Sequence, residues 1–127
     1  MPRPRVLARL PLADNRQMAK MMEPAEALAL LSLVAPTDDG IASRILFKNG
    51  SGNLTLFAFD AGQGLTEHTS PFDAFIIVLD GAMALKIDGK DIAAGPGTIT
   101  RMPANVPHAL EASTRAVLLL VMLRDAV

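Results

Sequence analysis

From Gly40 onward, short runs of apolar and β-branched residues alternate with turn signals, and this pattern restricts the fold more than any other feature of the chain. Glycine, proline, Asn-Gly or Asp-Gly separates most of the expected strands, which cover residues 41–47, 53–60, 65–68, 75–79, 82–87, 91–93, 99–102, 108–112 and 116–124. Asp88-Gly89 predicts a tight hairpin turn, because such turns require a positive φ that glycine adopts readily. Many short, evenly spaced strands predict an all-β sandwich or barrel.

The residues before Gly40 have a different character and predict an extension ahead of the barrel. Helix-forming residues dominate over 18–22 and 25–31, and Pro24 between them cannot stand inside a helix. We therefore expect an N-terminal extension over residues 1–39 that is partly helical, followed by one barrel domain over residues 40–127. The methionines of the extension are expected to pack against the barrel.

Composition excludes several classes of function. Twelve Lys and Arg nearly balance thirteen Asp and Glu, and the chain has neither Trp nor Tyr, so a nucleic acid finds no basic field and few stacking surfaces. The lack of cysteine removes disulfides, thiolate nucleophiles and cysteine-based zinc sites. We recognise no secretory leader and no apolar run long enough to span a bilayer. We expect a soluble cytoplasmic protein with no nucleic-acid partner and no membrane partner.

Two of the expected strands, residues 75–79 and 117–123, are apolar on both faces. A strand with one solvated face would alternate apolar and polar residues. One face of each strand can fill the barrel interior, and the other needs a cover, either the N-terminal extension or a second subunit. The pattern favours a homodimer.

Both histidines of the chain lie in segments that resemble the two sequence motifs of the cupin family. Segment 62–81 resembles the first motif and segment 97–108 the second, and the matching positions are Gly62, His68, Gly81, Gly97, Pro103 and His108. The resemblance covers the chain after about Gly40. It implies an all-β cupin jelly-roll barrel, here with a short helical N-terminal extension. Members of this superfamily range from enzymes to ligand-sensing domains, so the resemblance names a fold and leaves the reaction open.

The resemblance also implies a divalent metal centre, here with a reduced ligand set. His68 and His108 stand at two ligand positions of the family, whereas Ser70 replaces a second motif histidine and Ala74 replaces a glutamate. Asn105 replaces a glycine of the second motif, a mild change because asparagine tolerates left-handed backbone conformations. The metals implied are Fe, Mn, Ni or Zn, and two imidazoles alone would hold them weakly.

Asp73 and Glu67 compete to complete this centre. Asp73 precedes the glutamate position by one residue, so in a regular strand it would point to the opposite face. Pro71 interrupts the segment, and we expect a bend from which Asp73 turns inward to form a two-His, one-carboxylate set suited to Fe(II) or similar metals. Glu67 neighbours His68 in an extended strand and should point outward. Asp73 is therefore the predicted third ligand.

The expected pocket is mostly apolar. If His68 and Ser70 face inward, strand alternation beyond the bend brings Ile76 and Val78 inward as well. Met83 and Met102 are the further expected lining residues. Such a lining favours a small organic ligand with apolar bulk and one or two polar atoms. Gly62 and Gly64 are turn glycines without a phosphate-loop pattern, so no organic cofactor is expected.

Three functions remain open, and the sequence assigns no catalytic residue. The first is a metal-dependent enzyme in which the metal polarises or orients a small substrate. The second is a metal-free enzyme in which His68, oriented by Asp73, acts as a general base. The lack of Tyr removes the usual partner acid of epimerase-like cupins and weakens this second hypothesis. The third is a binding or sensing domain without chemistry.

Overall fold

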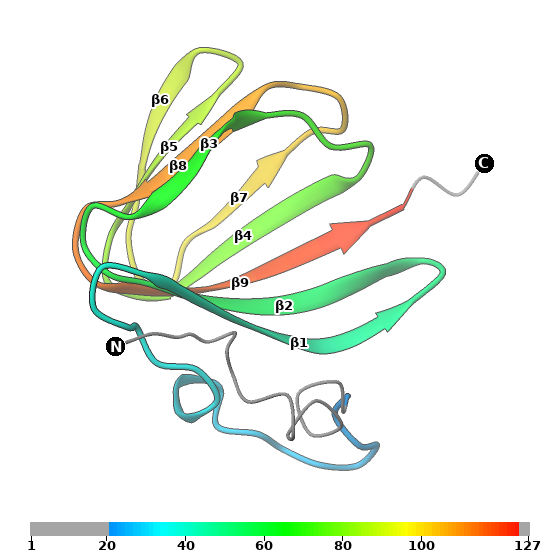
Figure 1. Ribbon diagram of the computed structural model, residues 1–127. Coiled ribbons are helices and arrows are strands. Elements are labelled where there is room, and N and C mark those ends of the chain that lie inside the picture. The colour runs from blue at the N-terminus through cyan, green and yellow to red at the C-terminus, as the bar shows by residue number, and fades with distance from the viewer. Residues whose placement is uncertain (1–20, 125–127) are drawn as a thin grey trace.

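The computed structural model describes residues 21–124 and contains two β-sheets packed face to face (Figure 1). In chain order the strands are β1 (Ile41–Asn49), β2 (Gly52–Phe59), β3 (Gly64–His68), β4 (Asp73–Asp80), β5 (Met83–Ile87), β6 (Lys90–Ala94), β7 (Ile99–Met102), β8 (His108–Ala112) and β9 (Ala116–Leu123). One sheet has the order β1-β2-β9-β4-β7 and the other β3-β8-β5-β6. Neighbouring strands are antiparallel. The predicted all-β barrel is confirmed.

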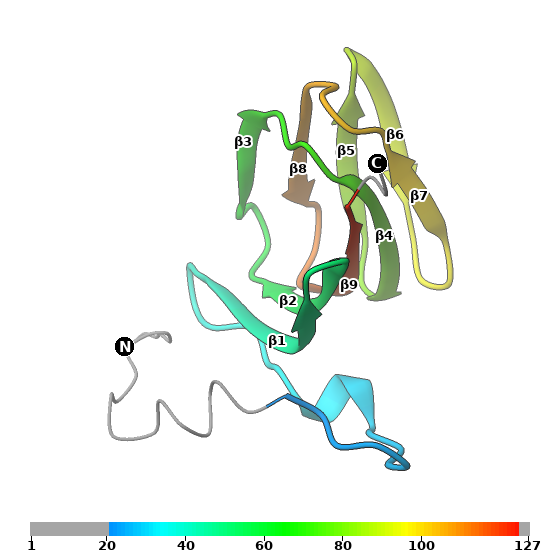
Figure 2. The ribbon, with the colours of Figure 1, turned by 90° about the vertical axis from the view of Figure 1, so that its right-hand side faces the viewer.

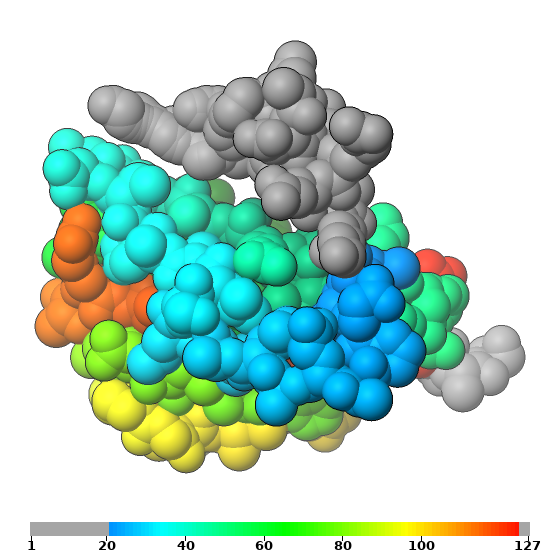
Figure 3. Space-filling view, turned by 90° about the horizontal axis from the view of Figure 1, so that it is seen from below, coloured from blue at the N-terminus to red at the C-terminus, as the bar shows by residue number. Residues whose placement is uncertain are grey.

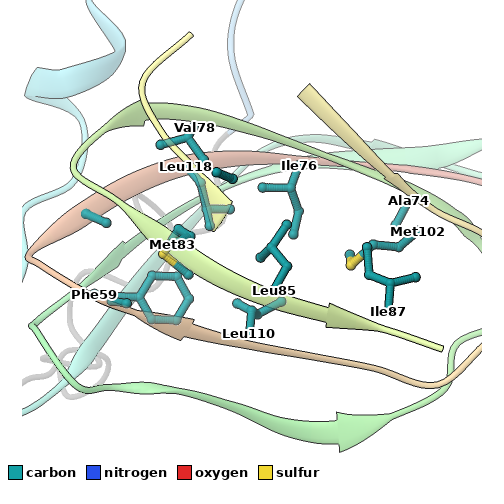
Figure 4. Close-up of a cluster of buried hydrophobic side chains, with 13 residues drawn as sticks. Phe59, Ala74, Ile76, Val78, Met83, Leu85, Ile87, Met102, Leu110 and Leu118 are labelled. Carbon is teal, nitrogen blue, oxygen red and sulfur yellow. The ribbon is translucent and has the colours of Figure 1, made fainter. Parts of the chain in front are cut away.

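The core lies between the two sheets and follows the alternation of their strands. In β5, Met83, Leu85 and Ile87 are buried, and the residues between them are exposed. In β4 the buried residues again alternate, but the residues between them are half-buried rather than exposed. Figure 4 shows the inward side chains meeting across the interior; the labelled members are Phe59, Ala74, Ile76, Val78, Met83, Leu85, Ile87, Met102, Leu110 and Leu118.

The hairpin between β5 and β6 has the predicted turn. Asp88 and Gly89 have φ angles of 51° and 80°. Two consecutive positive φ angles match the twist of an antiparallel pair, which explains the Asp-Gly sequence at this point. The paired strands then run in regular register from Met83↔Ala94 to Ile87↔Lys90.

The segment ahead of β1 lies across the outer face of the five-stranded sheet, as seen from below in Figure 3. Met22 donates its backbone N–H to the carbonyl oxygen of Leu46 in β1 at 2.8 Å. Leu56 and Ala58 point outward from β2 yet are fully buried. Their burial shows that this part of the outer face is covered within the subunit.

The predicted helix over residues 25–31 is wrong. Ala25 has a φ of 59°, which lies outside the helical region, and the helical turn in this segment is a short 3₁₀ turn at Leu30–Ser32. The backbone bond from Met22 to β1 fits an extended path along the sheet edge, so tertiary contact overrides helix propensity. The helix predicted over residues 18–22 lies mostly outside the described residues. Over residues 21–124, no helix is long and apolar enough to cross a membrane.

Candidate functional site

His68 and His108 stand side by side on neighbouring strands at one end of the barrel. They are register partners in the β3–β8 pair, and their ring centroids are 4.4 Å apart with the ring planes at 70°. His108 is only 4% exposed, whereas His68 is exposed to solvent. The structure thus brings the two predicted residues together, and the pair reaches from the core to the surface.

A β-bulge in β3 explains how His68 comes to face His108. Leu65 pairs with Leu110, and the next pair in the register joins His68 to His108. Three steps along β3 therefore match two steps along β8, which leaves one extra residue in β3. In an unbulged strand Glu67 would stand opposite His108. The bulge turns His68 inward, and Glu67 is exposed.

Both imidazole rings are held in one tautomer by their own backbone. His68 Nδ1 lies 2.7 Å from the carbonyl oxygen of Thr66, and His108 Nδ1 lies 3.0 Å from that of Val106. A carbonyl oxygen only accepts hydrogen bonds, so each Nδ1 must carry the hydrogen. In the neutral imidazole this leaves the lone pair of Nε2 available, which is the arrangement found in metal-ligating histidines.

The structure does not bring Asp73 to the histidine pair. The predicted bend at Pro71 ends before β4 begins, and pairing is already regular at Asp73↔Leu123. Asp73 therefore follows strand alternation away from the interior. Its Oδ1 accepts the Ala104 backbone N–H at 3.1 Å and a guanidinium N–H of Arg101 at 3.3 Å. Among residues 21–124, no three His, Cys, Asp or Glu side chains gather in a way that could hold a metal ion.

The loops at the rim of this end are tied together through Ser70. Its carbonyl oxygen accepts the backbone N–H of Asn105 at 2.8 Å, and its hydroxyl accepts the backbone N–H of Phe72 at 3.2 Å. Asn105 has a φ of 64°, in line with the left-handed conformation expected at a glycine position of the motif. Ser70 and Asp73 therefore both fasten the loop before β4 to the loop before β8.

The four apolar residues predicted for the pocket belong to the closed core. Ile76, Val78, Met83 and Met102 are 0–2% exposed and pack between the sheets. A separate shallow trough of about 610 Å³ lies over the outer face of the four-stranded sheet, and its lining includes Thr66, Ala84, Lys86, Ala109 and Glu111 but neither histidine. The trough is therefore separate from the candidate site at the histidine pair.

Sequence reasoning missed a row of side chains in the five-stranded sheet. Register places Asn53 beside Met122, Met122 beside Ala74, and Ala74 beside Met102. Asn53 and Thr55 lie on the same face of β2 as the inward residues Phe57 and Phe59, because all four are spaced two residues apart. This spacing is the signal that could have revealed the polar end of the row.

This row faces the histidine pair across the interior. The two sheets run in parallel order, so β3 and β8 lie over β2 and β9, and β5 lies over β4 (Figure 2). Ile87 is the register partner of His108, and Figure 4 shows Ile87 beside Ala74 and Met102. The position of the family's glutamate, here Ala74, is therefore inside the barrel, 2% exposed and flanked by two methionines.

The strongest electrostatic feature lies at the other end of β2, away from the histidines. The Asp60 carboxylate accepts the backbone N–H of Asp39 at 2.7 Å, the Arg115 Nε–H at 3.0 Å and the backbone N–H of Ala61 at 2.9 Å. These bonds hold the pKa of Asp60 below its usual range, and the bond from Asp39 has the largest effect. Arg115 also contacts Asp38 at 3.0 Å. The cluster fastens the entry of β1 to the turn before β9 and is structural.

A two-sheet jelly roll with a histidine from each of two neighbouring strands at one end defines a cupin-type barrel. The chain belongs to the cupin family, because residues 55–123 match the model of the cupin domain. No curated protein gives a significant match to the chain.

Solved structures agree with this assignment. A conserved protein of unknown function from Streptococcus pyogenes is 32% identical with a TM-score of 0.79, and the match covers 85% of this chain and 95% of that one. A cupin superfamily protein from Desulfitobacterium hafniense shares the fold at 24% identity and a TM-score of 0.77, covering 84% of this chain and 97% of that one. A cupin 2 conserved barrel domain protein from Leptotrichia buccalis is 30% identical with a TM-score of 0.72, covering 74% of this chain but only 46% of that one.

Proposed function

We propose that this cupin binds a small, mostly apolar organic ligand next to the His68–His108 pair, and that the two imidazoles hold a divalent transition metal there. The observation that carries the proposal is the pair itself: two adjacent rings with both Nδ1 atoms bonded to backbone carbonyls. This arrangement leaves two Nε2 lone pairs at the solvent-reached end of the barrel. One buried and one exposed imidazole suit a site that a ligand enters from outside.

The donor chemistry fits Fe, Mn, Ni or Zn with two protein ligands. Imidazole nitrogen is a good ligand for these metals, and the Nδ1–H bonds to Thr66 and Val106 fix each ring and raise its basicity. A bound metal would supply Lewis-acid polarisation of a ligand oxygen. The chain's own contribution is to orient the two rings and to close one side of the site with the packed core. Water and the ligand would occupy the coordination positions of a bound metal that no protein carboxylate fills.

The alternative is a binding or sensing domain without chemistry. It is favoured by Ala74, which leaves an apolar side chain where the family has a carboxylate, and by the ties of Asp73 to Ala104 and Arg101. In that case the two Nε2 atoms accept hydrogen bonds from the ligand or from water. The two functions share the same site and differ in whether the pair carries an ion.

Metal content tests the proposal. Protein made without a histidine tag is dialysed to equilibrium against a fixed concentration of Zn²⁺ or Ni²⁺, and the metal bound per chain is measured. We expect close to one ion per chain in the wild type, a loss in His108→Ala, and retention in Glu67→Ala, which is the matched control because Glu67 neighbours His68 but is exposed. Full loading of a double variant, His68→Ala with His108→Ala, overturns the proposal. A wild type that stays empty but binds apolar ligands supports the alternative.

A further inference from the structure

We infer that Asn53 is a specificity-determining residue that donates a hydrogen bond to an acceptor oxygen of the ligand, and that the ligand is a small apolar carboxylate. The inference rests on the proposed function and names the ligand class for the same site. It comes from the row of side chains that faces the histidines, in which Asn53 is a polar member next to Met122.

Asn53 lies on the inner side of the five-stranded sheet. It shares a face with Phe57 and Phe59 of β2, which pack in or against the core, and its register partner Met122 also packs against the core. The strand β2 runs opposite β3, the strand that carries His68 (Figure 2). Asn53 itself is half-buried. An amide in this position is close enough to solvent to meet an entering ligand and is partly shielded from water.

The orientation of the Asn53 amide is fixed. The Thr55 hydroxyl donates to Asn53 Oδ1 at 3.0 Å, and Thr55 is 8% exposed. Asn53 Nδ2 then lies 3.8 Å from Met122 Sδ. The flipped amide would set its oxygen against the thioether sulfur, which has no hydrogen to give. The amide therefore presents its N–H groups toward the methionines, and a thioether is too weak an acceptor to satisfy them.

A half-buried amide donor without a strong acceptor is a recognition element for an oxygen atom. Burying such a donor unpaired costs free energy, and a ligand oxygen removes that cost on binding. Lys48 is the register partner of Asn53 on β1 and is exposed, which adds a positive charge to the same edge. The nearby acids Glu67 and Asp73 follow outward positions, and Asp73 is paired with Arg101. Donor and cation together favour a carboxylate over a neutral or cationic group.

The neighbour of Asn53 in the row determines the apolar side of the ligand. Met122 is half-buried, and a thioether side chain adapts to apolar groups of varied outline, whereas Ala74 and Met102 farther along the row are buried in the core. The ligand then places its carboxylate toward Asn53 and Lys48 and its apolar body toward Met122. A further polar atom of the ligand, where there is one, meets the histidine pair.

Two probes of equal bulk and opposite polarity test this inference. Binding of cyclohexanecarboxylate and of cyclohexylammonium is followed by NMR titration of the full chain, with and without Zn²⁺. We expect the wild type to bind the carboxylate more tightly than the ammonium. Asn53→Asp replaces the donor by an acceptor, and we expect it to weaken carboxylate binding by about tenfold to a hundredfold and to reverse the preference. Asn53→Ser, which keeps a small polar group, should also lose carboxylate affinity.

Controls separate recognition from fold and charge. Asn49→Asp makes the same change of charge at an exposed position of the β1–β2 hairpin and should leave the preference unchanged. Thr55→Val frees the amide to flip and should weaken carboxylate binding less than Asn53→Asp. Carboxylate binding that requires His108 but is indifferent to Asn53→Asp overturns this inference and leaves the proposed function standing. Failure of both probes to bind the wild type overturns the inference together with the proposed ligand class.

Discussion

Replacing Ala74 by glutamate restores a carboxylate at the position where the cupin family has one, and its energetic consequence follows from burial. Ala74 is 2% exposed between Met102 and Met122, so the new carboxylate has no polar partner in its own sheet. Burying an unpaired carboxylate costs several kcal/mol after relaxation, and we take about 3 kcal/mol. For a domain of this length each kcal/mol lowers Tm by about 4 °C, so the metal-free variant should melt about 12 °C below the wild type.

Zinc should restore most of the stability that Ala74→Glu loses, because the new carboxylate is expected to face the His68–His108 pair. Free ligand at 100 times its Kd stabilises the folded state by about 2.7 kcal/mol, which corresponds to about 10 °C. The measurement is a thermal melt of Ala74→Glu with and without Zn²⁺, at concentrations set by calorimetry. We expect a smaller zinc response in the wild type, which lacks the third protein ligand.

Two further variants make the result decisive. Ala93→Glu places the same charge on the exposed face of β6, opposite Ala84, and should change neither the metal-free Tm nor the response to zinc. Ala74→Glu combined with His108→Ala should lose the zinc response. An Ala74→Glu variant that zinc does not stabilise, or that zinc stabilises equally without His108, would refute the placement of Ala74 opposite the histidines.

The pKa of Asp60 is lowered in the folded state, chiefly by the hydrogen bond from the Asp39 backbone and by Arg115. Its contribution to stability is therefore present above the ordinary carboxyl pKa and is lost as pH falls through the folded-state pKa. Asp60→Asn should flatten the acid side of a stability curve measured with urea. Gly81→Ala should lower the urea midpoint far more than Gly89→Ala, since both glycines have φ near 80° but only the first would set a Cβ 2.0 Å from a backbone oxygen; equal midpoints would contradict this. The outer face of β4 is apolar and only half-buried, and we expect it to form a homodimer interface. Light scattering at tens of micromolar should give a dimer mass for the wild type and a monomer mass for Ile77→Asp. A wild-type monomer would exclude this interface.

The barrel was predictable because its signals are local. Short apolar runs, Asp88-Gly89 and the other turn residues set strand positions, and the expected strands match the observed ones to within about two residues at most ends. The N-terminal segment was mispredicted for the opposite reason. Residues 25–31 favour a helix by composition, but Met22 bonds to the edge of β1 and Ala25 adopts a positive φ, so contacts with a distant strand decide its path.

The histidine pair was predictable from motif positions, whereas the rest of the site depends on register. Asp73 would face inward only if the irregularity at Pro71 extended into β4, and the pairing with Leu123 shows that it does not. The inferred role of Asn53 depends on β2 and β3 belonging to two different sheets, and no spacing within the sequence reports such a relation. Motifs therefore located the histidines, and only the three-dimensional pairing located their neighbours.

The bulge in β3 determines which side chain of that strand stands opposite His108. Because Leu65 and His68 are anchored to Leu110 and His108, the number of residues between them decides which side chain meets His108. Gain of one residue there, with the one-residue bulge kept, would exchange an imidazole for the carboxylate of Glu67 opposite His108, whereas an insertion in the loop after His68 would leave the pair in place. A single-codon insertion is thus a short evolutionary route from a two-histidine centre to a histidine–carboxylate centre on the same fold.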